Sequence, residues 1–94
     1  MVEVIWTNQA LIDLENIGTY IAQDSERYAQ LTITKLFTKT DILKVFPYSG
    51  RIVPEKNMDT IRELIDGSYR ILYEITEATT IHVLAVHHSS KFLF

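Results

Sequence analysis

The sequence predicts an α+β domain in which a small, mainly antiparallel twisted sheet is packed by an α-helical hairpin. Three observations lead to this fold class. In the last third of the chain, residues 69–75 and 81–87 place β-branched, aromatic and other apolar residues at alternate positions, with the period of two that half-buried strands have. Residues 9–45 instead repeat apolar side chains every three or four positions, as amphipathic helices do. The start of the chain, VEVIW over 2–6, is rich in strand-forming residues. The expected element order is β-α-α-β-β-β.

The composition is that of one globular domain covering residues 1–94, with 47% hydrophobic and 22% charged residues. Because the chain has no cysteine, disulfides and thiolate metal sites are excluded, which fits a reducing compartment. We find no secretory signal and no apolar run near the roughly 18 residues that span a bilayer, so we expect a cytoplasmic protein without membrane contact. The net charge of −3 lacks the basic surplus of nonspecific nucleic-acid binders.

The first half of the chain is expected to form one strand and two helices. Residues 2–6 form a short strand at or near the edge of the sheet, and Thr7 and Asn8 both offer side-chain oxygens that can cap a helix over 9–23. Residues 24–26 then break this helix and start a second one, which runs from about Glu26 to Val45. Two helices joined by so tight a break form an antiparallel hairpin.

The second half is expected to form a surface loop followed by a three-stranded antiparallel meander. Residues 47–59, which begin with Pro47 and contain Pro54, make a connection longer than most, and such connections often have a functional role. The strands follow over 60–65, 69–75 and 81–87. An Asp-Gly turn joins the first two strands, and a short polar connection over 76–80 joins the last two.

Strict alternation assigns the polar residues to the faces of this meander. Arg70 lies on the side of its strand opposite to the apolar Tyr69, Ile71, Tyr73 and Ile75. His87 is in phase with Ile81, Val83 and Ala85, so we place it at the rim of the core, with His82, Leu84 and Val86 on the opposite face. Arg62 and Arg70 lie on neighbouring strands, so their side chains can come close on one face.

Two interpretations of these arginines stay open. In one, they form ion pairs with Glu63, Asp66 or Glu74 on a solvated face and add little stability. In the other, the two guanidiniums recognise a phosphate or a carboxylate through bidentate contacts.

The histidines and the loop residues allow similar alternatives. His87 is either a satisfied histidine at the rim of the core or, like His88, a candidate general acid, because imidazole titrates near neutral pH. Neighbouring strand residues point to opposite faces, so the two histidines do not form a metal site. Arg51 is either a solvated loop residue or a binding residue, and Glu55 is either a solvated glutamate or a catalytic base. No nucleotide-binding or nucleophile motif is present, and we expect no cofactor.

Four segments in this order resemble the RelE/ParE superfamily of bacterial toxins over nearly the whole chain: VIWTNQALIDLENIGTYIAQDS, FPYSGRIVPE, IRELIDGSYRILYEI and IHVLAVHHSSK. The resemblance implies a small sheet packed by a helical hairpin. It also implies the toxin of a type II toxin–antitoxin module, which inhibits growth, serves plasmid stabilization and is neutralised by a cognate antitoxin protein. A heterotetramer with that antitoxin is one assembly that it suggests.

The superfamily has two activities. RelE-like members cut messenger RNA on the ribosome without a metal, and ParE-like members poison DNA gyrase. In a RelE-like reading, the resemblance places Arg70 at the scissile phosphate and His87 in the segment that holds the general acid, while Arg62 supplies part of the positive charge. The lysines of RelE-like members fall here on Ile61 and Glu63, which is a departure from the nuclease pattern.

These departures and the acidic net charge favour a ParE-like gyrase poison. The alternatives are a ribosome-dependent mRNA endoribonuclease, in which Arg70, His87 and Arg62 would be catalytic, and a non-toxic remnant that binds its partner. The residues expected to bind the target or the antitoxin lie in the loop, the meander and the C-terminal end: Arg51, Arg62, Arg70, His87, His88 and Lys91.

Overall fold

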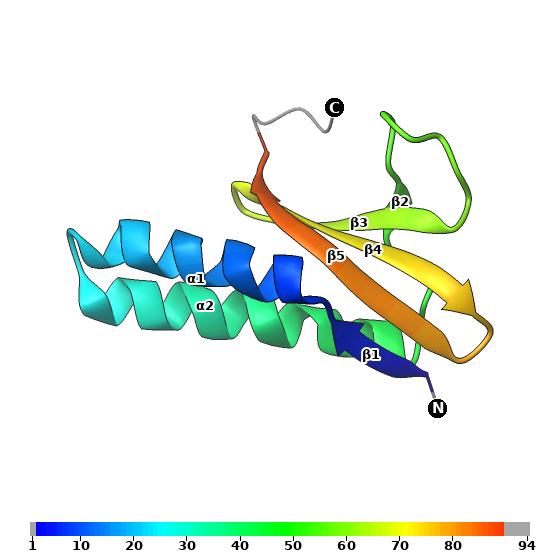
Figure 1. Ribbon diagram of the computed structural model, residues 1–94, viewed down its shortest axis with the longest axis horizontal. Coiled ribbons are helices and arrows are strands. Elements are labelled where there is room, and N and C mark those ends of the chain that lie inside the picture. Colours follow the sequence, from blue (N-terminus) through cyan, green and yellow to red (C-terminus); the bar gives the residue numbers. More distant parts are fainter. Residues whose placement is uncertain (1, 90–94) are drawn as a thin grey trace.

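A helical hairpin covers one face of a five-stranded sheet in the computed structural model, which describes residues 2–89 (Figure 1). The elements in chain order are β1 (Glu3–Trp6), α1 (Asn8–Ala22), α2 (Glu26–Lys39), the 3-10 helix η1 (Thr40–Lys44), β2 (Arg51–Ile52), β3 (Ile61–Asp66), β4 (Tyr69–Glu77) and β5 (Thr80–His88). The strand order is β1-β5-β4-β3-β2, and only the β1–β5 pair is parallel. The predicted α+β class, the mainly antiparallel sheet and the edge position of the first strand are confirmed.

The predicted loop over 47–59 contains one further strand. β2 has only two residues, which pair with Arg62 and Glu63 of β3 and form the second edge of the sheet. Strands β4 and β5 are also longer than predicted, because their connection consists only of Ala78 and Thr79. Within residues 2–89, no helix is long and apolar enough to cross a membrane.

Both helices begin where the capping residues predict. The hydroxyl of Thr7 accepts a hydrogen bond from the backbone N–H of Ala10 at 3.2 Å, and that of Ser25 accepts one from Tyr28 at 3.1 Å. The second helix, however, ends at Lys39 and not at Val45, since the chain tightens there into η1. The caps therefore fix the start of each helix, while the end of α2 was predicted six residues too late.

The core lies between the helical hairpin and the sheet face that it covers. Its side chains are all nearly fully buried and come from both layers: Ala10, Leu14, Leu36 and Leu43 from the helical segment, and Leu64, Ile71, Tyr73, Ile75, Ile81, Val83 and Val86 from the sheet. Burying a side chain of this size stabilises the fold by about 1.5–3 kcal/mol. A shift of one residue in any strand would expose these groups, so the core fixes the strand register.

A β-bulge interrupts the register between β4 and β5. Tyr73 lies opposite Val83, but Leu72, the residue that precedes Tyr73 in β4, lies opposite Ala85. Leu84 is therefore an extra residue without a partner of its own in β4. Such a bulge reverses the facing of every residue that follows it.

The bulge corrects the predicted facing of the last strand. Val86 takes the core position opposite Ile71 and is 3% exposed, while His87 lies opposite Arg70 on the other face. The prediction that Ala85 and His87 continue the core side of β5 is wrong. Burying a valine in place of an alanine is worth about 1.5 kcal/mol at about 0.8 kcal/mol per carbon, which favours the bulged register.

Candidate functional site

A group of four charged side chains lies together on the sheet face turned away from the helices, here called the outer face. Arg51 of β2 lies opposite Glu63 of β3, and Arg70 of β4 lies diagonally beside Glu63. Glu55, from the connection between β2 and β3, completes this group, which we call the charge cluster. Its members come from three neighbouring strands and the loop between two of them.

Arg70 is the centre of the charge cluster. Its two terminal nitrogens each donate to a different carboxylate oxygen of Glu55 at 2.9 Å, which is the bidentate geometry of strong arginine–carboxylate pairs. Its Nε donates to Glu63 Oε1 at 2.6 Å, and the other oxygen of Glu63 accepts a hydrogen bond from Arg51. Arg70 and Glu63 are buried. Among residues 2–89, two positive and two negative charges thus balance within one partly dry cluster.

The hydrogen bonds of the charge cluster shift the ionisation of its members. The side chain of Arg70, helped by the backbone N–H of Glu55 itself, lowers the pKa of Glu55 from 4.5 to about 2 against the opposing effect of desolvation. Glu55 in turn raises the pKa of Arg70 above its ordinary value, with Glu63 adding to the effect and burial opposing it. Both partners are therefore charged at neutral pH.

The Glu55–Arg70 pair holds the loop after β2 on the side of the sheet away from the helices (Figure 1). Val53, at the start of that loop, is fully buried. The preference for Glu55 as a solvated loop residue is wrong, because its side chain is only 13% exposed. The ion pair between Arg70 and Glu63 was one of those predicted, but it was expected on a solvated face and is instead buried.

Arg62 does not join the charge cluster. The β3–β4 turn pairs Asp66 with Tyr69, and this register places Arg62 opposite Tyr73, on the face that the helices cover. Arg70 belongs to the outer face. The expectation that Arg62 and Arg70 meet on one face is wrong, because the facing depends on the exact pairing at the turn, which the Asp-Gly signal alone does not give.

Arg62 and Tyr73 instead anchor the long loop. The guanidinium of Arg62 donates to the side chain of Asp59 at 2.7 Å and to the carbonyl of Gly50 at 2.8 Å. The hydroxyl of Tyr73 donates to the carbonyl of Pro47 and accepts from the N–H of Gly50, both at 2.9 Å. Burial raises the pKa of Tyr73. Tyr73 was predicted only as a core residue, and its second role has no signal in the alternation pattern.

The two histidines point to opposite faces, as adjacent strand residues must. His87 lies on the outer face opposite Arg70, and His88 lies on the other face opposite Tyr69, with its ring 5.9 Å from that of the tyrosine. No group of His, Asp or Glu in the described part of the chain is arranged to hold a metal ion. Lys91 lies outside the described residues.

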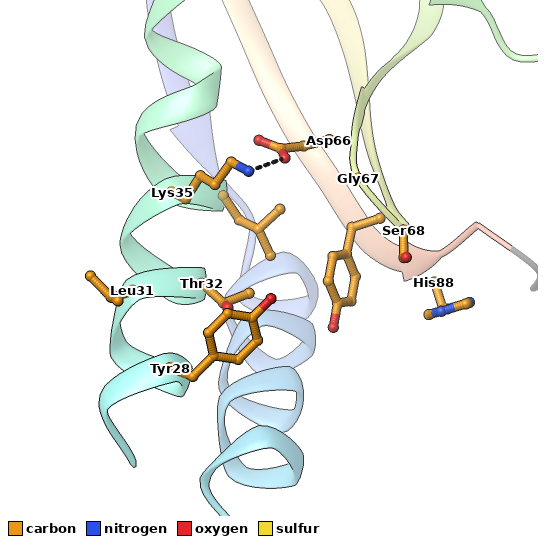
Figure 2. A pocket seen from close by; sticks show the side chains of 10 residues that line it. Tyr28, Leu31, Thr32, Lys35, Asp66, Gly67, Ser68 and His88 are labelled. Carbon is orange, nitrogen blue, oxygen red and sulfur yellow. Dashed lines mark ion pairs between the residues drawn. The ribbon is translucent and has the colours of Figure 1, made fainter. Parts of the chain in front are cut away.

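A groove of about 350 Å³ runs between α2 and the β3–β4 turn, and His88 forms part of its wall (Figure 2). Tyr28, Leu31 and Lys35 line the α2 side. The ammonium of Lys35 reaches across to Asp66, 3.1 Å away. Leu31 is 57% exposed at this groove.

The sequence matches known proteins over almost its whole length. Residues 4–91 match the family described as the ParE toxin of the type II toxin–antitoxin system, parDE. The chain is 34% identical over 92 residues to Toxin RelE2 of Caulobacter vibrioides, covering 97% of this chain and 99% of that protein.

Two solved structures share the fold. The chromosomal ParDE toxin–antitoxin system from P. aeruginosa aligns with a TM-score of 0.76 at 18% identity, over 94% of this chain and 96% of that one. The toxin–antitoxin complex RelBE2 from Mycobacterium tuberculosis aligns with a TM-score of 0.59 at 23% identity, over 93% and 96% of the two chains. At these identities the likeness concerns the fold alone.

Proposed function

We propose that this chain, which belongs to the ParE/RelE family as a toxin of a type II toxin–antitoxin system, arrests growth by poisoning DNA gyrase. The family membership leaves two targets open, gyrase and messenger RNA on the ribosome. The choice between them depends on whether the outer face can stabilise a phosphate in the course of RNA cleavage.

The balanced charge cluster is the observation that carries this proposal. Cleavage of RNA without a metal needs preorganised cations aimed at the charge that develops on the phosphate. Here the guanidinium of Arg70 is directed at the carboxylates of Glu55 and Glu63. An incoming phosphate would have to displace a bidentate carboxylate and approach a second one against Coulombic repulsion. This arrangement supports a role for Arg70 in holding the fold together.

A second candidate function has one observation in its favour. His87 lies directly opposite Arg70 on the outer face, so an imidazole and a guanidinium lie side by side, as a general acid and a phosphate ligand would. In this alternative, a ribosome-dependent and metal-independent mRNA endoribonuclease, Arg70 and His87 are the catalytic residues. Arg62 lies on the other face and would not reach the same phosphate.

The cognate antitoxin is the proposed protein partner, and the groove beside α2 suits one of its segments. Tyr28 and Leu31 offer exposed apolar surface there. Lys35 and Lys39 follow on the same side of the helix at spacings of four and eight from Leu31, and no acidic residue of α2 shares this side. An amphipathic segment with acidic residues is therefore the complementary ligand. A segment that folds on binding can cover such a surface and remains easy to remove by proteolysis.

Induced expression in bacterial cells separates the targets. We expect arrested growth, double-strand breaks at gyrase cleavage sites and intact transcripts, with relief when the neighbouring antitoxin gene is expressed as well. Transcripts cut within codons, without gyrase-dependent breaks, would instead establish the endoribonuclease. Neither kind of damage, together with normal growth, would identify a remnant that only binds its partner.

The groove is tested by substitution of Leu31, an exposed aliphatic side chain of its wall. Leu31→Asp should abolish co-purification with the antitoxin and leave growth arrest intact. Ile12→Asp is the matched control, because Ile12 is an exposed apolar residue of the other helix, 51% exposed against 57% for Leu31. Equal antitoxin binding by both variants would contradict the assignment of the groove.

A further inference from the structure

The β-bulge in β5 is held by polar contacts from the start of α1. The backbone N–H of Val86 donates to Asp13 Oδ2 at 3.0 Å, across 73 residues of sequence. The hydroxyl of Thr7 donates to the carbonyl of Val83 at 2.8 Å and lies 3.3 Å from that of Leu84, the extra residue. Gln9 donates to the other oxygen of Asp13 at 2.8 Å and so orients the carboxylate.

The position of β1 explains why β5 needs this support. β1 is paired with β5 only from Thr80 to Val83. Beyond Val83, no strand within residues 2–89 lies beside this edge of β5, and its outward backbone groups require other partners. The carboxylate of Asp13 supplies one acceptor for the N–H of Val86, at the place where the chain has just passed the bulge.

Two registers compete at this point. Without the bulge, the pairing of Tyr73 with Val83 would continue through Leu72 with Leu84, and His87 would arrive opposite Tyr69 on the helix-covered face. With the bulge, Leu72 pairs with Ala85, and His87 lies opposite Arg70 on the outer face. The regular register is the one that simple alternation in the sequence favours. Burial of Val86 favours the bulged register, and the contacts from α1 add to this preference because they satisfy backbone groups of β5 at the bulge.

We propose that Asp13 is a positioning residue that helps to select the bulged register, and thereby places His87 on the outer face. Asp13 acts through the backbone of β5 and touches neither His87 nor a target. The consequence for growth arrest rests on the proposed function, but the structural role of Asp13 is measurable without it.

Paired cysteines report the register, because the chain contains no cysteine of its own. In the Leu72→Cys/Ala85→Cys variant, the two cysteines are direct partners in the bulged register. In the Leu72→Cys/Leu84→Cys variant, they are direct partners in the regular register. Cα atoms of directly opposed antiparallel residues lie about 4.5–5.5 Å apart, within the range of disulfides. Full-length chain from cell-free synthesis, which avoids toxicity, is oxidised mildly and the cross-linked fraction is compared.

With Asp13 intact, we expect the 72/85 pair to cross-link and the 72/84 pair to stay reduced. Asp13→Leu should reverse this preference. Asp13→Asn, which keeps an oxygen acceptor, and Glu15→Leu, a substitution of an exposed acid on the same helix, should leave it unchanged. Cross-linking that is the same with and without Asp13→Leu would overturn the proposal.

A second measurement covers the case in which Asp13→Leu does not fold. Asp13→Ala favours the helix, and in this variant the N–H of Val86 should lose its protection from hydrogen exchange while the N–H of Val83 keeps it. Unchanged protection of Val86 would also overturn the proposal.

In cells, Asp13→Leu should abolish growth arrest without loss of antitoxin binding, while Glu15→Leu arrests growth. An Asp13→Leu variant that shifts the cross-link but still arrests growth would refute the functional consequence. If the unmodified chain causes no arrest, the proposed function fails, but the cross-linking result still decides the role of Asp13.

Discussion

Replacing Arg70 with methionine tests whether the charge cluster holds the fold together. Methionine keeps much of the aliphatic volume and removes the guanidinium. Glu63, whose side chain is fully buried, then keeps only Arg51 as its partner in the cluster, and the side chain of Arg51 is 61% exposed. Removing one partner of a buried ion pair costs about 3–5 kcal/mol. Because Arg51 remains, we expect a loss of about 3 kcal/mol, which is a large part of the roughly 5–15 kcal/mol that stabilises a domain.

The free energy of unfolding is measured in urea through the fluorescence of Trp6, the single tryptophan, whose ring stacks on Phe37 at 5.0 Å. Adding Glu63→Leu to Arg70→Met removes the buried charge as well. Replacing both members of a buried pair with apolar groups is often close to neutral, so the double variant should recover most of the loss. Arg27→Met, a substitution of an exposed arginine on α2, serves as the control and should change stability by less than about 0.5 kcal/mol.

Two outcomes would refute this reasoning. The first is a free energy of unfolding of Arg70→Met that lies within about 0.5 kcal/mol of that of the unmodified chain. The second is a double variant that is no more stable than Arg70→Met alone. The double variant also separates stability from activity. Growth arrest by a refolded Arg70→Met/Glu63→Leu chain is expected if Arg70 serves the fold. Its loss at restored stability would mean that the guanidinium contacts the target, which favours the endoribonuclease.

Three further predictions concern single side chains. Glu55 has a pKa of about 2 in the fold against 4.5 in the unfolded chain, so it contributes stability that is present above pH 4.5 and lost as the pH falls toward 2. The urea midpoint should therefore fall more steeply over this pH range for the unmodified chain than for Glu55→Gln. Gly18→Ala places a Cβ 2.3 Å from the Cδ1 of Ile33. In thermal unfolding, this overpacking should cost about 1–3 kcal/mol of stability, offset by about 1 kcal/mol of gained helix propensity. Adding Ile33→Val removes the Cδ1 atom and should restore stability. Tyr73→Phe leaves one buried N–H of the long loop without its acceptor, which should lower the free energy of unfolding in urea by about 1–3 kcal/mol. Proteolysis of the loop should also be faster. An unchanged midpoint and cleavage rate would contradict the role of the hydroxyl.

The regular elements of this fold could be predicted from the sequence because each has a local cause. The caps at Thr7 and Ser25 mark where the two helices begin, and period-two alternation marks β4 and the first half of β5. β2 could not be predicted in this way. With two residues it has no measurable period, and it exists because its backbone completes the edge of β3. Such a strand is a product of tertiary pairing and leaves no pattern of its own.

The candidate site was harder to predict, because the facing of each residue depends on register. A single residue of shift moves a side chain to the opposite face. The β3–β4 turn separates Arg62 from Arg70 in this way, and the bulge at Leu84 moves His87 to the side of Arg70. The contact that stabilises this bulge comes from Asp13, 73 residues away. No short window of sequence contains both partners.

Glu63 links the fold to the choice between the two activities. The resemblance to RelE-like members puts a lysine at this position, and this chain has a buried glutamate there with an arginine nitrogen 2.6 Å from one oxygen. A lysine could not occupy that place, because its ammonium would lie against Arg70 and Arg51 in a site of low dielectric. The charge cluster and a nuclease-type row of cations therefore exclude each other on the same three strands. Glu63 stands where metal-free RNA cleavage would need a positive charge, which supports the proposal of a target bound through protein surface, such as gyrase.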